Sequence, residues 1–353
     1  MRSTLVRKTL LATLSSAAVL TGTRALAQGC EPIRFTTPVS LGSQGEAYQR
    51  KNEWRLTLGY RRLASNEWFV GTEDASSRGP GGQSPVFRIN TLVADIAFAP
   101  TERLQFHLGV PFSGGSFSLI WPDKVRHTQS VKGIGDVSVL GEAWLLSPRA
   151  HQGGNVSVGL GLKAPTGKHD ASSYIYTATA AVPYPADQTV QPGDGGWAVL
   201  LQSQAFRQVS ERVYGYAFGS YTVSPKARGD VQFRPSTPGV YWSVPDTYSA
   251  RAGAAFSVLP DQGLTMSLGG RMDGIPLRDL VGGGDNDTIK RTSRVIFVDP
   301  GLSLTRGKDN FTVSVPWRVS VNRFQSLYER RTNGLNAGGF AKYLIFASYS
   351  RRI

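Results

Sequence analysis

The sequence predicts an all-β protein whose antiparallel strands close into a transmembrane β-barrel of about 12 strands, with short periplasmic turns and long extracellular loops. Three observations carry this prediction. Apolar and polar residues alternate with period two along most of the chain. The connections between these segments alternate between long and short, and the chain begins like an exported protein. A soluble sandwich or barrel is the alternative, but such folds have no reason to sort their loops by length.

The first 27 residues predict a secretory signal peptide. A basic start is followed by an apolar run and by the small-residue sequence ALA, which ends at Ala27. The expected location is therefore the outer membrane of a Gram-negative bacterium. Cys30 leaves lipidation of the mature N-terminus open, although Ala27-Gln28-Gly29 is a poor lipidation sequence. Because Cys30 is the one cysteine of the chain, no intramolecular disulfide can form.

The charge of the chain predicts the kind of surface it meets. The formal net charge is +14, and residues 1–27 hold four of the 39 basic residues and none of the 25 acidic ones, so the remainder carries +10. In an exported chain this excess favours anionic lipid surfaces or anionic solutes over nucleic acid. We expect outer-membrane lipid and lipopolysaccharide as partners, and no nucleic acid.

The alternating segments have the length of barrel strands, near the ~9–11 residues that cross a bilayer when tilted. Residues 28–51 precede them and are expected either to fold inward as a plug or to stay in the periplasm as a tail, and the barrel is assigned to 52–353. The predicted strands are 53–63, 88–99, 103–113, 136–146, 155–165, 197–207, 213–223, 247–258, 264–273, 294–305, 310–322 and 340–353.

In a membrane barrel the apolar face meets lipid and the polar face lines the interior. Aromatic residues near strand ends, such as Trp54 and Phe98, are expected in the interfacial girdles. Besides the acids Asp136, Glu142 and Asp299, the predicted lumen-lining residues are Arg55, Arg61, Asp95, Arg103, His107, Lys163, Arg251, Arg271, Asp273 and Arg318.

Many of these charges are expected to form ion pairs that stiffen the wall, rather than a ladder for solutes. If Asp261-Gln262-Gly263 is a three-residue hairpin loop, Arg251 lies opposite Asp273. Arg55 and Arg61 have no evident partner, so we consider them the best candidates for solute contacts. Strand register also predicts Asp95 close to Arg103 and His107, and Asp299 close to Arg318.

No enzymatic site is predicted. A membrane-embedded lipid hydrolase needs a serine activated by a histidine, and none of the four histidines has a serine two residues later. Histidines and one cysteine are not spaced as a metal set, so no metal or cofactor is expected. The stretch GLKAPTGKHD fails the P-loop pattern because Leu162 stands at the first glycine position and His169 at the Ser/Thr position.

Several short motifs occur in an order that resembles a known family. They are GIGD (133–136), GLKAPTGKHD, QPGDGGW (191–197), VDPGLSL (298–304) and the final FAKYLIFASY, with CEPIRF and GRMDGIPLRDLVGG in addition. In these the chain, from Cys30 to its end, resembles the outer-membrane transporter family assigned to the meta-pathway of phenol degradation.

The resemblance implies a channel for passive uptake of small hydrophobic or aromatic molecules, with the solute itself unidentified. The alternative is a structural or surface-interaction barrel with a closed lumen. The barrel-assembly machinery is the expected folding partner, although its recognition signals usually end in Phe or Trp and this chain ends Arg351-Arg352-Ile353.

Overall fold

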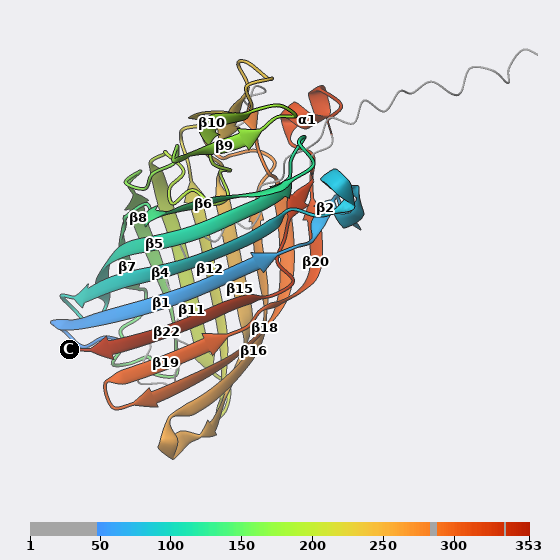
Figure 1. The fold of residues 1–353 in the computed structure, drawn as a ribbon. Helices are drawn as coiled ribbons and strands as arrows, with labels where there is room; N and C mark the ends of the chain where they lie inside the picture. Colours follow the sequence, from blue (N-terminus) through green and yellow to red (C-terminus); the bar gives the residue numbers. More distant parts are fainter. Residues whose placement is uncertain (1–47, 283–287, 335–336) are drawn as a thin grey trace, which may run out of the picture.

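The computed structural model describes residues 48–282, 288–334 and 337–353. The predicted signal peptide, Cys30 and residues 28–47 of the N-terminal segment lie outside the described residues. The described chain forms a closed, antiparallel barrel of 12 strands (Figure 1). Closure pairs every wall strand with two neighbours, which satisfies the backbone polar groups that a membrane cannot hydrate. None of the helices in the described ranges is long and apolar enough to cross a membrane.

The wall strands follow one another around the barrel in chain order, and β22 pairs with β1 to complete the circle. One wall position is shared by β19 and β20, which are interrupted at Val315 and Pro316. The wall consists of β1 (Glu53–Ser65), β4 (Val86–Ala99), β5 (Leu104–Ile120), β7 (Ser138–Trp144), β8 (Gly154–Lys163), β11 (Ala198–Gln208), β12 (Val213–Val223), β15 (Thr247–Leu259), β16 (Leu264–Ile275), β18 (Ser293–Arg306), β19 (Asp309–Ser314) with β20 (Trp317–Arg323), and β22 (Leu344–Arg352).

These strands confirm the predicted all-β barrel, and ten of the twelve predicted spans coincide with one wall strand within four residues at either end. The predicted strand 310–322 is two strands, because the ring of Pro316 has no N–H to give to the sheet and breaks the ladder there. The long predicted strand 103–113 continues to Ile120, where its upper half pairs with β6 (Arg126–Ile134) instead of β7.

The outer surface carries the apolar half of the alternation. Leu58, Leu92 and Leu160 are more than half exposed, as expected of side chains that meet lipid. Trp54 and Phe98 are register partners on neighbouring strands, with ring centroids 4.6 Å apart, at the end of the barrel that also holds the C-terminus. Such paired aromatics are typical of the girdle at a membrane interface.

The two ends of the barrel differ as predicted. Short turns join the strands at the periplasmic end, near the C-terminus, and long loops rise from the other end (Figure 1). The long loops fold into short elements of their own: β2 (Trp68–Val70), β3 (Glu73–Asp74), η1 (Ser76–Arg78), η2 (Pro80–Gly82), β9 (Ser172–Tyr176), β10 (Ala181–Pro185), β13 (Arg228–Gln232), β14 (Tyr241–Ser243), β17 (Thr288–Ile289), α1 (Leu327–Arg331) and β21 (Gly338–Gly339). One periplasmic turn holds η3 (Pro260–Gln262).

The interior changes character along the barrel axis. In the lower, periplasmic half of the barrel the inward-facing residues are mostly polar. The extracellular half holds an apolar core beneath the loops. Phe87 and Phe117 stack in this core with centroids 4.9 Å apart, and Phe340 joins them from the last loop. The loops are therefore packed onto the barrel by burial of apolar side chains, which fixes the groups that they carry into the lumen.

Candidate functional site

The lumen is the candidate functional site, because the polar half of the strand alternation lies inside it. Asp95, Gln105, Glu142 and Ser157 are each at most 4% exposed, although each is a polar residue on a wall strand. Buried polar groups of this kind persist only where they are paired. The pairing of the predicted lumen residues therefore determines which of them can meet a solute.

A cluster in the lower lumen joins four strands. His107 Nδ1 lies 3.2 Å from Asp95 Oδ1, and His107 Nε2 lies 3.7 Å from Glu142 Oε2, so the predicted proximity of Asp95 and His107 is present. Arg55 Nη2 donates to the side-chain oxygens of Gln49 and Gln105, at 2.9 and 3.1 Å. Arg55 therefore has partners, which are neutral amides and could not be identified by searching the sequence for opposite charges.

Arg103 differs from its predicted role. Its guanidinium donates to the backbone carbonyls of Trp144 and Leu145, at 3.1 and 2.7 Å, at the periplasmic turn. The predicted contact with Asp95 is not formed, because these two carbonyls hold the side chain. Arg103 thus fastens two strand ends together rather than lining the middle of the lumen.

The prediction that Arg251 lies opposite Asp273 is wrong by two residues. Arg251 pairs in register with Arg271, because residues 260–263 form a four-residue turn and a bulge follows Ser257. Gly263 has the left-handed conformation that the prediction assumed, with φ of 66°. Arg251 and Asp273 each form an ion pair with another residue.

Those partners form a second buried cluster on the opposite part of the wall. Arg251 Nε lies 2.5 Å from Asp299 Oδ2, and Arg271 Nε donates to Asp273 Oδ2 at 2.8 Å. Arg318 contacts Glu67 and donates to the carbonyl of Phe340 at 2.9 Å. Its predicted partner Asp299 pairs with Arg251 instead, so this prediction is wrong. Glu67 lies in the first extracellular loop, outside the strands from which partners were sought.

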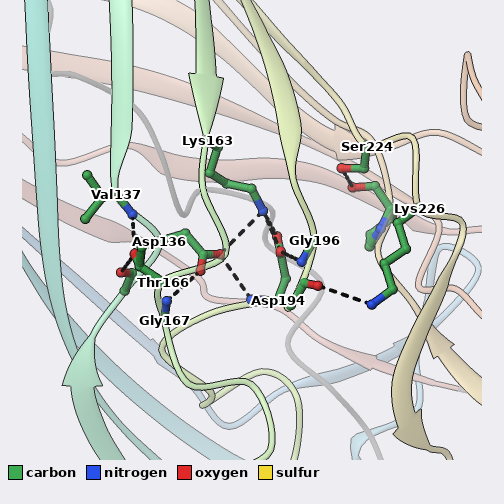
Figure 2. Close-up of polar contacts among 12 residues, drawn as sticks. Asp136, Val137, Lys163, Thr166, Gly167, Asp194, Gly196, Ser224 and Lys226 are labelled. Atoms are coloured by element: carbon green, nitrogen blue, oxygen red, sulfur yellow. Dashed lines mark hydrogen bonds and ion pairs between the residues drawn. The ribbon is translucent and has the colours of Figure 1, made fainter.

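The third cluster unites three motifs that are far apart in sequence. Lys163, at the end of β8, is fully buried between the carboxylates of Asp136 and Asp194 (Figure 2). Asp136 also accepts backbone hydrogen bonds from Gly167 at 2.9 Å and from Asp194 at 3.1 Å. Asp136 belongs to GIGD, Lys163 to GLKAPTGKHD and Asp194 to QPGDGGW, so the motifs meet around one buried amine.

This cluster anchors residues 186–196, which we call the inner segment. The segment follows β10 and turns into the barrel, where Val190 is 2% exposed and packs on β5. A side chain at Gly115 of β5 would place its Cβ 2.9 Å from the Val190 Cβ, so a glycine is required for this approach. Asp187 of the segment also lies 4.0 Å from Arg291.

Two cavities lie inside the barrel, and the upper one adjoins the inner segment. The upper one, of about 110 Å³, is bordered by Arg61, Lys290 and Arg291 together with apolar residues such as Leu63 and Ile275. The lower one, of about 40 Å³, includes Asp95 and His107. Both are lined by Pro111 and Thr222, so they follow one another along the lumen. Arg61 thus lies at a cavity, while its Nη2 donates to Thr91 Oγ1 at 3.2 Å.

The periplasmic end is narrowed by the described part of the N-terminal segment. Tyr48 packs on the inward rings of Trp144 and Phe206, with centroids 4.9 and 5.6 Å away, and its hydroxyl donates to the carbonyl of His151 at 2.6 Å. Gln49 is 1% exposed. Residues 48 and 49 therefore enter the barrel mouth, and the role of 28–47 stays a prediction.

Sequence reasoning missed Asp187, Asp194, Lys290 and Arg291, which border the lumen from the loops. Their local sequences read as exposed turns, and no periodicity marks a loop residue as inward. The one available signal was the glycine-rich context of Asp194, because repeated glycines permit backbones to approach closely.

The protein-family models and curated protein sequences contain no match to the chain. Solved structures do resemble it. The COG4313 outer membrane channel from Pseudomonas putida F1 is 13% identical and has a TM-score of 0.57, over 90% of this chain and 100% of that one. The chain therefore shares the fold of a known outer-membrane β-barrel.

Two further barrels are less similar. A mutant of the monoaromatic hydrocarbon channel TodX is 11% identical with a TM-score of 0.46, over 94% of this chain and 97% of that one. The β domain of the Bordetella autotransporter BrkA is 12% identical with a TM-score of 0.45, over 86% of this chain and 100% of that one.

Proposed function

We propose that this protein is an outer-membrane channel for passive uptake of small molecules with an apolar or aromatic body. The observation that carries the proposal is the series of two adjoining cavities inside a closed barrel, where apolar side chains such as Leu63, Ile89 and Leu140 line the space together with polar and charged ones. A wall that only had to hold loops at the surface has no need of this space. The resemblance to the phenol-degradation family favours the same class of solute.

The lumen is constricted at two points, which sets the expected size of the current. The inner segment lies inside the extracellular half, and Tyr48 packs on two inward rings of the wall at the periplasmic mouth. Twelve-stranded barrels are intermediate between filled eight-stranded barrels and open porins of 16–18 strands. We therefore propose a narrow passage, opened by movement of one or both constrictions, rather than a permanent wide pore.

A structural or surface-interaction barrel is the second candidate, and the same constrictions favour it. If they never move, the loops are the functional part and the interior is a support. No step of catalysis is assigned to any residue under either proposal.

Current through the refolded protein in a planar bilayer, under a salt gradient, tests the proposal. Discrete small steps are expected, with a reversal potential that shows which ion passes more easily. Uptake of a small aromatic alcohol into liposomes containing the protein gives the solute readout. Absence of both current and uptake, from a protein whose gel mobility shifts on heating as folded barrels do, would reject the channel in favour of the structural candidate.

A further inference from the structure

A third and larger cavity, of about 280 Å³, lies among the extracellular loops. It is bordered by the β5–β6 connection, the β9–β10 hairpin and the β13–β14 loop and is partly open to solvent, and its wall includes the aromatic side chains of Trp121, Tyr176, Phe233 and Trp242. A dry apolar cavity of ~150 Å³ is enough to bind benzene. This cavity therefore has room for one substituted ring.

The wall of this cavity also holds polar donors that are not used. Among the described residues, Nε and Nη2 of Arg234 and Nε1 of Trp121 are buried and have no hydrogen-bond partner. An arginine side chain stays charged in proteins, so Arg234 cannot avoid the cost of burial by losing its proton. Burial lowers the pKa of Arg234, the signature of a cation whose compensation is incomplete.

The groups around Arg234 do not fully compensate its buried charge. The ring of Phe233 lies 4.4 Å from the guanidinium carbon and offers a weak cation–π contact. The carboxylate of Asp187, which lines the same cavity, acts on Arg234 electrostatically and offsets part of the effect of burial. However, Asp187 accepts hydrogen bonds from both donors of Thr189, at 2.9 and 2.6 Å, and lies 4.0 Å from Arg291.

We propose that this cavity binds a small organic anion, an apolar ring that bears a carboxylate, with the ring against the aromatic wall and the carboxylate toward Arg234. A carboxylate satisfies buried donors with charge-assisted hydrogen bonds, whereas a neutral ring leaves them unpaired. Nε and Nη2 are buried in the cavity wall, so a direct hydrogen bond to the carboxylate requires the guanidinium to turn toward it. Its charge attracts the ligand without that movement.

The position of the cavity makes it an extracellular entry site, and this part of the inference rests on the proposed channel function. Ala186 and Asp187 line this cavity, while Gln188 and Val190 of the same inner segment line the upper cavity of the lumen. The Arg291 guanidinium lies 4.5 Å from the ring of Trp242, at the border of the two. A ligand in the outer cavity is thus separated from the lumen by the inner segment.

The test is calorimetric titration of the full chain in detergent with benzoate and, separately, with benzyl alcohol, which has the same ring but no charge. We expect saturable binding of benzoate, and about tenfold weaker binding after Arg234→Gln, the loss typical of a hydrogen bond to a charged group. Arg234→Lys should retain most of the affinity. Arg78→Gln is the matched control, because Arg78 is exposed in another extracellular loop and forms an ion pair with exposed Glu73.

A second variant guards against a local folding effect at Arg234. Ser236 is exposed and borders the cavity, so Ser236→Trp should block both ligands without disturbing the wall. Equal binding of benzoate and benzyl alcohol, unaffected by Arg234→Gln, would overturn the anion assignment, and absence of saturable benzoate binding would overturn the site. Because titration requires no current, benzoate binding by a protein silent in bilayers and in uptake would refute the channel and leave the site standing.

Discussion

Replacement of Lys163 by methionine tests how the inner segment is held. The methionine keeps most of the aliphatic stem and removes the amine that lies between Asp136 and Asp194. Lys163 and Asp136 are both fully buried, so solvent does not replace the lost partner. Removal of one member of a buried ion pair costs about 3–5 kcal/mol, because the remaining charge is left uncompensated.

That cost falls on local opening of the inner segment. Each ~1.4 kcal/mol changes an equilibrium tenfold, so the opening constant should rise by roughly a hundredfold to a few thousandfold. The amides of Gly167 and Asp194 donate to Asp136, and the Gly193 amide donates to the Lys168 carbonyl at 3.0 Å. Hydrogen exchange of peptides that cover these amides measures the opening directly.

Two variants make the result interpretable. Lys226→Met removes a neighbouring lysine that is 40% exposed, pairs with Asp230 and donates to the Gly195 carbonyl of the inner segment at a long 3.4 Å. These exposed contacts are worth about 0–1 kcal/mol, so exchange should change by about fivefold or less. Lys163→Met combined with Asp194→Asn removes one of the stranded charges and should recover part of the protection. Unchanged exchange in Lys163→Met, with normal heat-dependent mobility, would refute the argument that this cluster anchors the segment.

Three further predictions concern the lumen and the periplasmic end. Tyr48→Ala removes packing on two inward rings and should raise single-channel conductance, as should deletion of 28–51, whereas equal conductance would exclude a seal at this end. Replacement of Arg55 and Arg61 together by glutamine should reduce any anion preference, and an unaltered reversal potential would end their assignment as solute contacts. The hydrogen bond from Arg149 lowers the pKa of Glu102 below 4.5. The contact is therefore fully formed above that pH and is lost as the pH falls through the lowered pKa. Arg149→Gln should raise the pKa of Glu102 in an NMR titration.

The fold could be predicted because a membrane barrel encodes each strand locally. Alternation places Leu58 and Leu160 outside and Asp95 and Ser157 inside without knowledge of any other strand, and loop length gives the orientation. The predicted residue pairs were wrong where the strand register depends on one additional residue in a turn. The turn at 260–263 is one residue longer than assumed and a bulge follows, so Arg251 meets Asp299 instead of Asp273.

The partners of the candidate site could not be predicted for a related reason. Glu67 and Asp194 reach the interior from loops, and a loop residue has no period that indicates which way it points. Arg103 is held by backbone carbonyls, which every sequence contains, and therefore leaves no signal in the sequence. Strand faces follow from local pattern, whereas the contents of the lumen follow from how the loops fold back.

The contrast between a hydrogen-bonded wall and loops folded into the lumen also identifies which part of the molecule has to move if solutes pass. The wall strands are hydrogen-bonded to neighbours on both sides, and opening them exposes backbone groups to lipid at a cost of several kcal/mol each. The inner segment is held by the Lys163 cluster, by the contact between Val190 and Gly115, and by Asp187 near Arg291. Release of the segment exposes its groups to water rather than lipid, so it is the less costly movement. If Lys163→Met raises exchange and current together, the segment is the constriction of a channel; if it raises exchange alone, the segment is a support and the lumen is closed elsewhere.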